Sequence, residues 1–245
     1  MTQRFDSILI GSMLMAVLFV FPASGQGVTL VLQDGLDGYD GTDDTTIYED
    51  SPTLSNGGYT SFFAGRTNGT FATTLRRAAI RFDLSSIPSD AQVLAVTLTL
   101  VVENTASSSQ LHTLHAIQKD WVEGTVIGGN RGGPSNSGDM TWDENISGTS
   151  TSTNSGGDFG SSSAQTFVSG NGSTALFSSS ALEADVQGWL DNPSTNFGWM
   201  MVGNEGAIKT AKRFFSSEGF APRRPALTIV YQPPGISEVS NWEKY

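Results

Sequence analysis

Cysteine is absent from the 245-residue chain, and histidine occurs only twice. The absence of cysteine excludes disulfides, thiol nucleophiles, zinc–thiolate sites and iron–sulfur clusters. Basic residues are scarce as well, because 13 lysines and arginines stand against 24 aspartates and glutamates, for a formal net charge of −11. Nucleic-acid binding depends on a basic surface, so this composition argues against a nucleic-acid partner.

Long apolar runs are also rare, and the one strong run lies near the N-terminus. It spans residues 8–21, follows Arg4 and precedes the small residues Ala23-Ser24-Gly25. This arrangement is typical of a secretory signal peptide, which we expect to occupy residues 1–25 and to be cleaved before Gln26. An uncleaved anchor is the alternative, but the run is short for a membrane span. No later segment is apolar enough to cross a bilayer, so we predict a secreted, extracellular or cell-surface protein.

The remaining sequence has the alternation of β-strands nearly throughout. Residues 78–84 alternate most clearly, with apolar side chains on one face and Arg77 and Arg81 on the other. Only residues 180–190 have the apolar spacing of a helix. Many strands with one short helix predict an all-β fold, a jelly-roll-like antiparallel β-sandwich formed by residues 26–232. Strands are expected at residues 28–33, 78–84, 92–102, 111–117, 197–202 and 226–231, with weaker candidates at 45–48, 60–64 and 174–177.

Glycine, serine, asparagine and threonine dominate between residues 128 and 180. We interpret residues 128–139 and 148–163 as long surface loops of the same domain, because the strands on either side are needed by one sandwich. Residues 233–245 follow the last expected strand and are predicted to form a flexible tail or linker.

Several stretches taken together resemble one family of domains. They are GLDGYDGTDDTTI, SPTLSNGGYTSFFAG, RRAAIRFDLSSIP, KDWVEGTV, MTWDEN, GGDFG, VQGWLDNPSTNFGWMMVGNE and RFFSSE followed by RPALTIVY. In this order they resemble a DNRLRE-type domain, a group related to carbohydrate-binding module family 96 and to disaggregatase-type repeats. The resemblance covers about residues 28–232, and RRAAIRFDLSSIP and KDWVEGTV are its most specific pieces. It implies a β-sandwich of secreted bacterial or archaeal proteins, some of which bind acidic polysaccharide such as alginate.

The few basic residues are concentrated in two segments, around residues 66–81 and 209–224. Arginine suits uronate or sulfate groups because its guanidinium grips a planar anion with two hydrogen bonds. If the two segments are neighbours in space, they form a basic strip on an acidic protein. The alternative is internal pairing, for instance of Arg81 with Glu218 or Asp83, which would make the arginines part of the fold. The expected glycan-binding residues are Arg66, Arg76, Arg77, Arg81, Lys212 and Arg213, with Tyr59 at an exposed rim.

Five aspartates and three glycines occur in residues 34–47, which read DGLDGYDGTDDTTI. Asp37, Asp40 and Asp43 are candidate ligands for a structural calcium ion, because glycine turns can fold carboxylates and carbonyls around a hard cation. Their spacing is not that of an EF-hand loop. A calcium site elsewhere in the sandwich and plain Asx turns ahead of the first strands are the alternatives.

Catalytic patterns are weak. The two histidines of HTLH are three residues apart, so on a strand they point to opposite faces, and no Gly-x-Ser-x-Gly elbow is present. Asp120 with Glu123, or Asp143 with Glu144, would need to face one glycosidic bond to act as acid and base. We therefore predict a secreted, non-catalytic module that binds an acidic extracellular polysaccharide. The alternative is a structural or adhesive module of the cell surface or matrix without its own glycan site.

Overall fold

A computed structural model describes residues 27–69 and 74–234 of the chain. The expected signal peptide of residues 1–25 lies outside the described residues, as does most of the expected tail of residues 233–245. Within the described ranges, no helix is long and apolar enough to span a membrane.

Strands dominate the described residues, and one α-helix, α1, spans Ser180–Asp191. Three short 3₁₀ turns occupy Gly129–Arg131, Pro193–Thr195 and Ala221–Arg223. The strands are β1 (Val28–Leu32), β2 (Thr42–Tyr48), β3 (Leu54–Ser55), β4 (Ser61–Arg66), β5 (Leu75–Phe82), β6 (Gln92–Thr105), β7 (Gln110–Ile117), β8 (Gly133–Pro134), β9 (Glu144–Ile146), β10 (Ser150–Thr151), β11 (Phe159–Val168), β12 (Thr174–Phe177), β13 (Trp199–Val202), β14 (Lys212–Phe215) and β15 (Ala226–Gln232).

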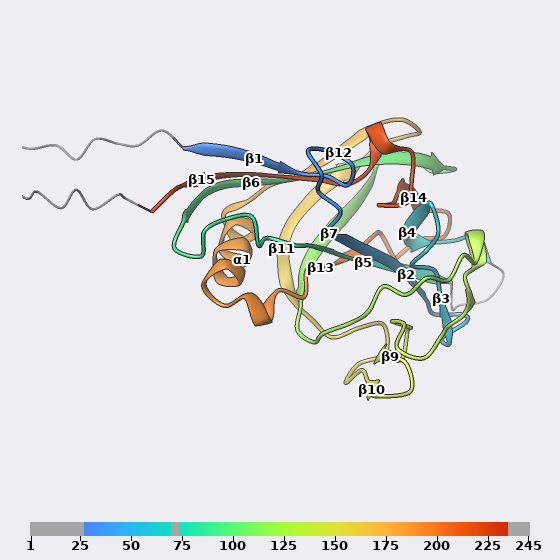
Figure 1. The fold of residues 1–245 in the computed structure, drawn as a ribbon. Helices are drawn as coiled ribbons and strands as arrows, with labels where there is room; N and C mark the ends of the chain where they lie inside the picture. The colour runs from blue at the N-terminus through green and yellow to red at the C-terminus, as the bar shows by residue number, and fades with distance from the viewer. Residues whose placement is uncertain (1–26, 70–73, 235–245) are drawn as a thin grey trace, which may run out of the picture.

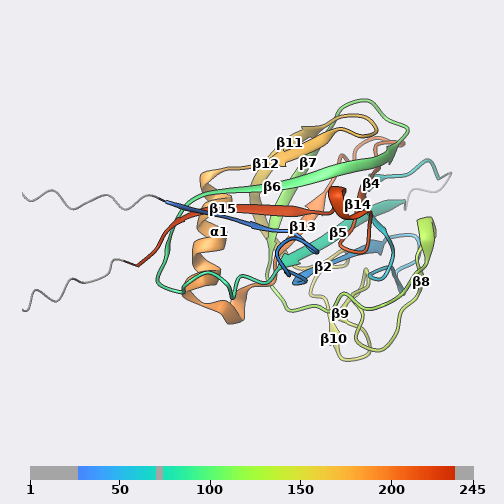
Figure 2. The same ribbon diagram turned by 45° about the horizontal axis from the view of Figure 1, so that its top comes forward.

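The main strands form two antiparallel layers (Figures 1 and 2). One layer has the order β1-β15-β6, and β12 pairs with the other edge of β6. The opposite layer has the order β2-β5-β13-β7-β11. Strands β14 and β4 join the layers, because β14 pairs with both β6 and β4, and β4 pairs with β5. The predicted jelly-roll-like antiparallel β-sandwich with one short helix is confirmed.

The main core lies between the two layers. Ala78, Ile80 and Phe82 of β5 point into it, as do Leu98 and Leu100 of β6. These residues are two apart along each strand, and strand side chains with that spacing share one face. The sequence alternation therefore translates directly into the buried faces of the sandwich.

Helix α1 closes one end of this core beside β6 (Figure 1). Its N-cap is Ser179, whose Oγ accepts a hydrogen bond of 3.0 Å from the Leu182 N–H. Its buried stripe consists of Leu182, Val186, Trp189 and Leu190, the spacing that predicted the helix.

A second, smaller apolar cluster covers the outer face of β5. The segment between β7 and β11, residues 118–158, crosses this face and contributes two of the cluster's tryptophans. The face of β5 that carries Arg77 and Arg81 is therefore mostly covered by protein rather than open to solvent. The cluster consists of Ile47, Ala79, Ile117, Trp121, Met140, Trp142 and Met200.

The prediction of a continuous loop at residues 148–163 is wrong. Strand β10 lies within this range, and β11 already begins at Phe159 and pairs with β7. The polar residues Ser161–Ser163 lack the alternation of apolar and polar side chains from which a strand is predicted. The pairing of β11 with β7 also shifts register at two places there. Composition alone predicted a loop where backbone pairing forms a strand.

Candidate functional sites: a basic groove and an acidic cluster

Strands β5, β4 and β14 bring the two basic segments together. Arg213 of β14 is opposite Phe63 of β4, and the end of β4 pairs Gly65 with Arg76 of β5. The segments expected to be neighbours are thus neighbours in the sheet.

Two adjacent hollows lie over these strands, with volumes of about 230 Å³ and 430 Å³. Both are lined by Thr67, Arg76 and Asn130, so they lie next to each other, and we treat them together as one groove. Arg213 lines the first hollow, and Arg131 lines the second. We call this surface the basic groove. Among the described residues its lining includes Arg76, Arg131 and Arg213, the buried Lys212, the acid Asp50, and Phe63, Asn104, Thr105 and Asn130.

Two arginines of the basic groove are held in place by acids. Arg76 lies 2.8 Å from Asp50 Oδ1 and stacks on Tyr48, with its guanidinium carbon 4.7 Å from the ring centroid. Arg213 Nε lies 3.0 Å from Glu103 Oε2, and Arg213 Nη1 donates to the Asn130 side chain. Each contact fixes the orientation of a guanidinium, and Arg76 is buried whereas Arg213 is partly exposed at the groove. Their positive charge is partly offset by these partners.

Arg131 differs from these two arginines. It ends the 3₁₀ turn Gly129–Arg131, is exposed, and makes no recorded ion pair or side-chain hydrogen bond with the described residues. Sequence reasoning missed it, because it stands alone in the glycine-rich stretch GGNRGG. The sequence did offer one indication that Arg131 is unpaired: no acidic residue lies within several positions of it.

Arg77 and Arg81, both expected to contact a glycan, are used by the fold. Arg77 binds the Glu205 carboxylate through Nε and Nη2 at 2.8 Å and 3.0 Å and donates to the Gly156 carbonyl. Arg81 binds Asp43 at 2.6 Å and Asp120 at 2.9 Å. Both also stack on rings of the second cluster. Internal pairing, the alternative for Arg81, is what the structure shows, although with partners other than Glu218 and Asp83.

Lys212 cannot serve as a surface ligand contact, because its side chain is completely buried at 0 % exposure. Its Nζ donates to the carbonyls of Ser107, Ser108 and Ser169 at 3.2 Å, 2.7 Å and 2.8 Å. Burial lowers the Lys212 pKa, and the three carbonyls supply the partners that a buried ammonium needs. Lys212 thus ties the β6–β7 turn to the β11–β12 turn.

The remaining expected contacts, Arg66 and Tyr59, lie on or beside β4. Arg66 ends β4, is half-buried, and its backbone N–H donates to Thr210 Oγ1 at 2.9 Å. The Tyr59 ring stacks on Phe63, with the ring centroids 6.4 Å apart and the planes 7° from parallel. Because Phe63 lines the basic groove, Tyr59 extends an aromatic surface beside it.

The aspartates expected to bind calcium are not gathered. Asp37 and Asp40 are exposed in the turn between β1 and β2, and Asp43 is paired with Arg81. Asp34 Oδ1 instead accepts the Thr42 N–H at 3.1 Å, a contact across the whole turn between β1 and β2 rather than the bond to the second following residue that defines an Asx turn. Among the described residues, the one group of three or more potential metal ligands is elsewhere.

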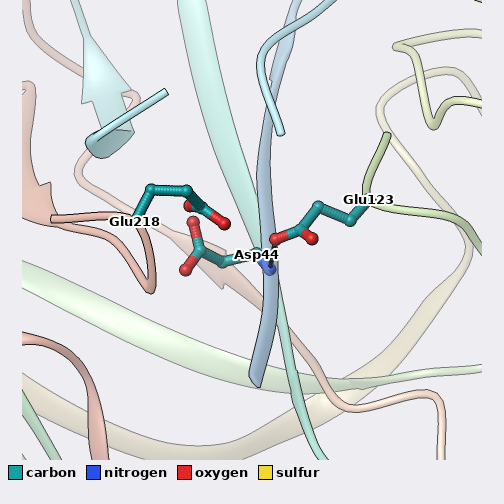
Figure 3. A group of neighbouring side chains, drawn as sticks. All are labelled: Asp44, Glu123 and Glu218. Atoms are coloured by element: carbon teal, nitrogen blue, oxygen red, sulfur yellow. Dashed lines mark hydrogen bonds between the residues drawn. The ribbon is translucent and has the colours of Figure 1, made fainter. Parts of the chain in front are cut away.

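That group consists of Asp44, Glu123 and Glu218, whose ligand oxygens lie within 4.8 Å of one another (Figure 3). Asp44 is buried on β2 and accepts the Ser217 N–H at 2.7 Å. Glu123 Oε1 accepts the Asp44 N–H at 2.6 Å. Glu218 is exposed and accepts a hydrogen bond from Ser217 Oγ. We call these three residues the acidic cluster.

The acidic cluster concentrates negative charge without a recorded cationic partner among the described residues. Burial, and then the charge of Asp44, raise the pKa of Glu123 to about 9. Burial also raises the pKa of Asp44 and of Glu218, each further raised by neighbouring carboxylates. The cluster must therefore take up protons or a cation to be stable at neutral pH.

Calcium fits this arrangement better than it fits the aspartate turn. Ca²⁺ takes six to eight oxygen ligands, of which three carboxylates supply the charged part and carbonyls or water the rest. Glu218 is exposed, which gives an ion access from solvent. When bound, the ion would neutralise the three carboxylates and join β2 to the segments that carry Glu123 and Glu218. Sequence reasoning missed the cluster, although Glu123 and Glu218 lie in the quoted stretches KDWVEGTV and RFFSSE.

Three of the four carboxylates considered for glycosidic chemistry are engaged in other contacts. Asp120 binds Arg81, Glu123 belongs to the acidic cluster, and Glu144 Oε2 accepts the Gly148 N–H. The histidines point to opposite faces of β7, as predicted. His112 is buried edge-on to Phe214, burial lowers its pKa to about 4, and His115 packs on Phe159.

Comparison with known proteins adds no relative: no family model matches the chain, and no curated protein matches it significantly.

Proposed function

We propose that the protein is a secreted, non-catalytic module that binds an acidic polysaccharide in the basic groove. The observation that carries the proposal is the lining of the groove, where the exposed Arg131 has no acid partner among the described residues and lies beside Arg76 and Arg213, which are paired with Asp50 and Glu103. A protein with a net charge of −11 repels polyanions over most of its surface. The unpaired guanidinium of Arg131, with two further arginines beside it, is therefore the place where a polyanion can bind.

The groove offers the groups that a uronate chain requires. Guanidinium forks bind carboxylates with two hydrogen bonds, and Asn104, Asn130 and Thr105 supply amide and hydroxyl partners for sugar hydroxyls. The parallel rings of Tyr59 and Phe63 provide an apolar surface beside them. The resemblance of the sequence to DNRLRE-type domains supports the same ligand class. Binding along a repeating polymer would add avidity to a weak single site.

A structural or adhesive module without a glycan site is the second candidate. It is favoured by Arg77 and Arg81, because both expected glycan contacts are consumed by ion pairs within the fold. The two candidates differ in what they predict for Arg131, which contributes to the groove and to no recorded contact of the fold.

Replacement of Arg131 by glutamine is expected to weaken binding to anionic polysaccharide by about tenfold or more, because it removes one charge-assisted hydrogen-bonding group worth roughly 1.5–3 kcal/mol. The measurement is affinity electrophoresis through gels that contain alginate, pectate, a sulfated glycan or neutral xylan. The wild-type protein should be retarded by anionic polymers and not by xylan.

Arg223→Gln is the matched control, because Arg223 is an exposed arginine outside the groove and its loss changes the net charge equally. Its retardation should equal that of the wild type. Equal losses for both variants would indicate nonspecific charge attraction. The absence of retardation in every gel would move the assignment to the structural module.

A further inference from the structure

Strand β1 has a free edge. Its residues Val28–Leu32 pair with β15 on one side, and no other described strand pairs with them. Proteins protect such edges with charges, proline or bulges, because unpaired backbone groups recruit other strands. The sequence VTLVL has no charge and no proline, and its pairing with β15 has no register shift. Val28 and Val31 are 40 % and 37 % exposed, so this unprotected edge is open among the described residues.

A hollow of about 490 Å³ runs beside this strand. Four consecutive residues of β1, Thr29 to Leu32, line it. Successive side chains of a strand point to opposite faces, so a hollow lined by consecutive residues lies along the strand edge rather than on one face. Because β15 occupies the other edge, the hollow is on the free side.

The far wall of the hollow is the acidic turn that sequence analysis considered for calcium. Asp37 and Asp40 line it together with Asp83, and no lysine or arginine is among the described residues that line it. Arg224, which donates to the Asp34 carbonyl at 3.1 Å, does not line the hollow. Leu36 and Tyr39 add apolar surface to the same wall.

We propose that this groove binds an extended, basic peptide segment of a partner protein, which adds a strand to the free edge of β1. Backbone hydrogen bonds to β1 would provide affinity that does not depend on the side chains of the peptide, as in other cases of strand addition. The carboxylates of Asp37 and Asp40 would select lysine or arginine side chains on the added strand. The five residues of β1 span about 17 Å, so a segment of five or six residues fills the edge. This surface is separate from the basic groove and uses opposite charge.

The test is fluorescence polarisation of the protein with a labelled, end-capped peptide Lys-Val-Lys-Val-Lys-Val. Two control peptides are Glu-Val-Glu-Val-Glu-Val, which reverses the charge, and Lys-Val-Lys-Pro-Lys-Val, which keeps the charge and disrupts the strand. We expect saturable binding of the first peptide that is about tenfold tighter than binding of either control.

Asp37→Asn/Asp40→Asn should weaken that binding about fivefold, because two ion pairs with the peptide are lost. Asparagine tolerates the left-handed φ of 51° at Asp37, so the turn keeps its shape. A matched single pair is Asp40→Asn against Asp90→Asn, an exposed acid outside the groove, which should not change binding.

Equal binding of the proline peptide would overturn the proposal, because it would show attraction by charge without strand addition. No binding of any peptide would overturn it as well. A dimer in sedimentation equilibrium that is disrupted by Val31→Lys would show that a second copy, rather than a basic peptide, takes the edge.

Discussion

Replacement of Lys212 by methionine is expected to lower the free energy of unfolding by about 3 kcal/mol or more. The side chain is completely buried, and its ammonium is the donor to three carbonyls from two turns. Methionine fills similar space without donors, and each buried acceptor left unpaired costs about 1–3 kcal/mol. Removal of the buried charge offsets part of this loss. Urea unfolding at neutral pH measures the difference.

Lys209→Met is the matched control, because Lys209 precedes Lys212 by three residues and is exposed. Its free energy of unfolding should stay within about 0.5 kcal/mol of the wild type. If Lys212→Met were as stable as Lys209→Met, the three carbonyls would have other partners, and Lys212 would be free for another role.

The second large effect is expected from calcium and pH together. In a chelator, thermal stability should fall as pH rises from about 5 to 9. The pKa of Glu123 is raised to about 9 in the folded protein, so the protonated carboxyl stabilises the folded state at low pH, and this contribution is lost as pH rises through that value. The raised pKa values of Asp44 and Glu218 act in the same direction.

Calcium should remove this loss, because it replaces the protons as the neutralising charge. For a dissociation constant of about 10⁻⁴ M, calcium at about 5 mM stabilises by roughly 2.3 kcal/mol, which corresponds to about 5–9 °C in Tm. At pH 5 the shift should be smaller, since protons compete for the same oxygens. Differential scanning calorimetry with calcium or chelator at both pH values measures these shifts.

Two variants locate the calcium effect. Glu123→Gln should abolish the calcium shift at pH 8, whereas Asp40→Asn, in the turn first considered for calcium, should retain it. Superimposed calcium and chelator curves for the wild type would show that the acidic cluster holds protons alone. Loss of the shift in Asp40→Asn instead would return the metal to the aspartate turn.

Most of the fold could be predicted from the sequence, because a strand that is buried on one side alternates apolar and polar residues along the chain. Residues 78–84 were predicted on this basis and residues 92–102 from their content of valine, leucine and threonine, and β5 and β6 contain nearly all of them. The same logic failed for β11, whose first residues are polar and pair through the backbone. It also failed for Arg77 and Arg81: alternation placed them opposite the core but could not show that a second cluster covers that face.

The candidate sites were less accessible to sequence reasoning, because charges meet through the topology of the sheet. Asp44, Glu123 and Glu218 are far apart in the chain and converge only when β2 and two distant segments meet. The sequence pattern also does not show whether a charged residue faces solvent. Lys212 was predicted at the surface because it lies in a basic segment, yet it is buried with three carbonyl partners.

The central claim is that the groove-lining arginines Arg76, Arg131 and Arg213 contact glycan, although Arg76 and Arg213 also pair with acids, whereas Arg77 and Arg81 serve the fold alone. The most direct test is arginine side-chain NMR, in which the Nε–H resonances are assigned and followed during titration with an oligouronate. We predict that the resonances of the groove-lining arginines shift saturably and that those of Arg77 and Arg81 stay in place. Shifts of Arg77 and Arg81 with unchanged Arg131 and Arg213, or no shift at all, would contradict the proposed groove.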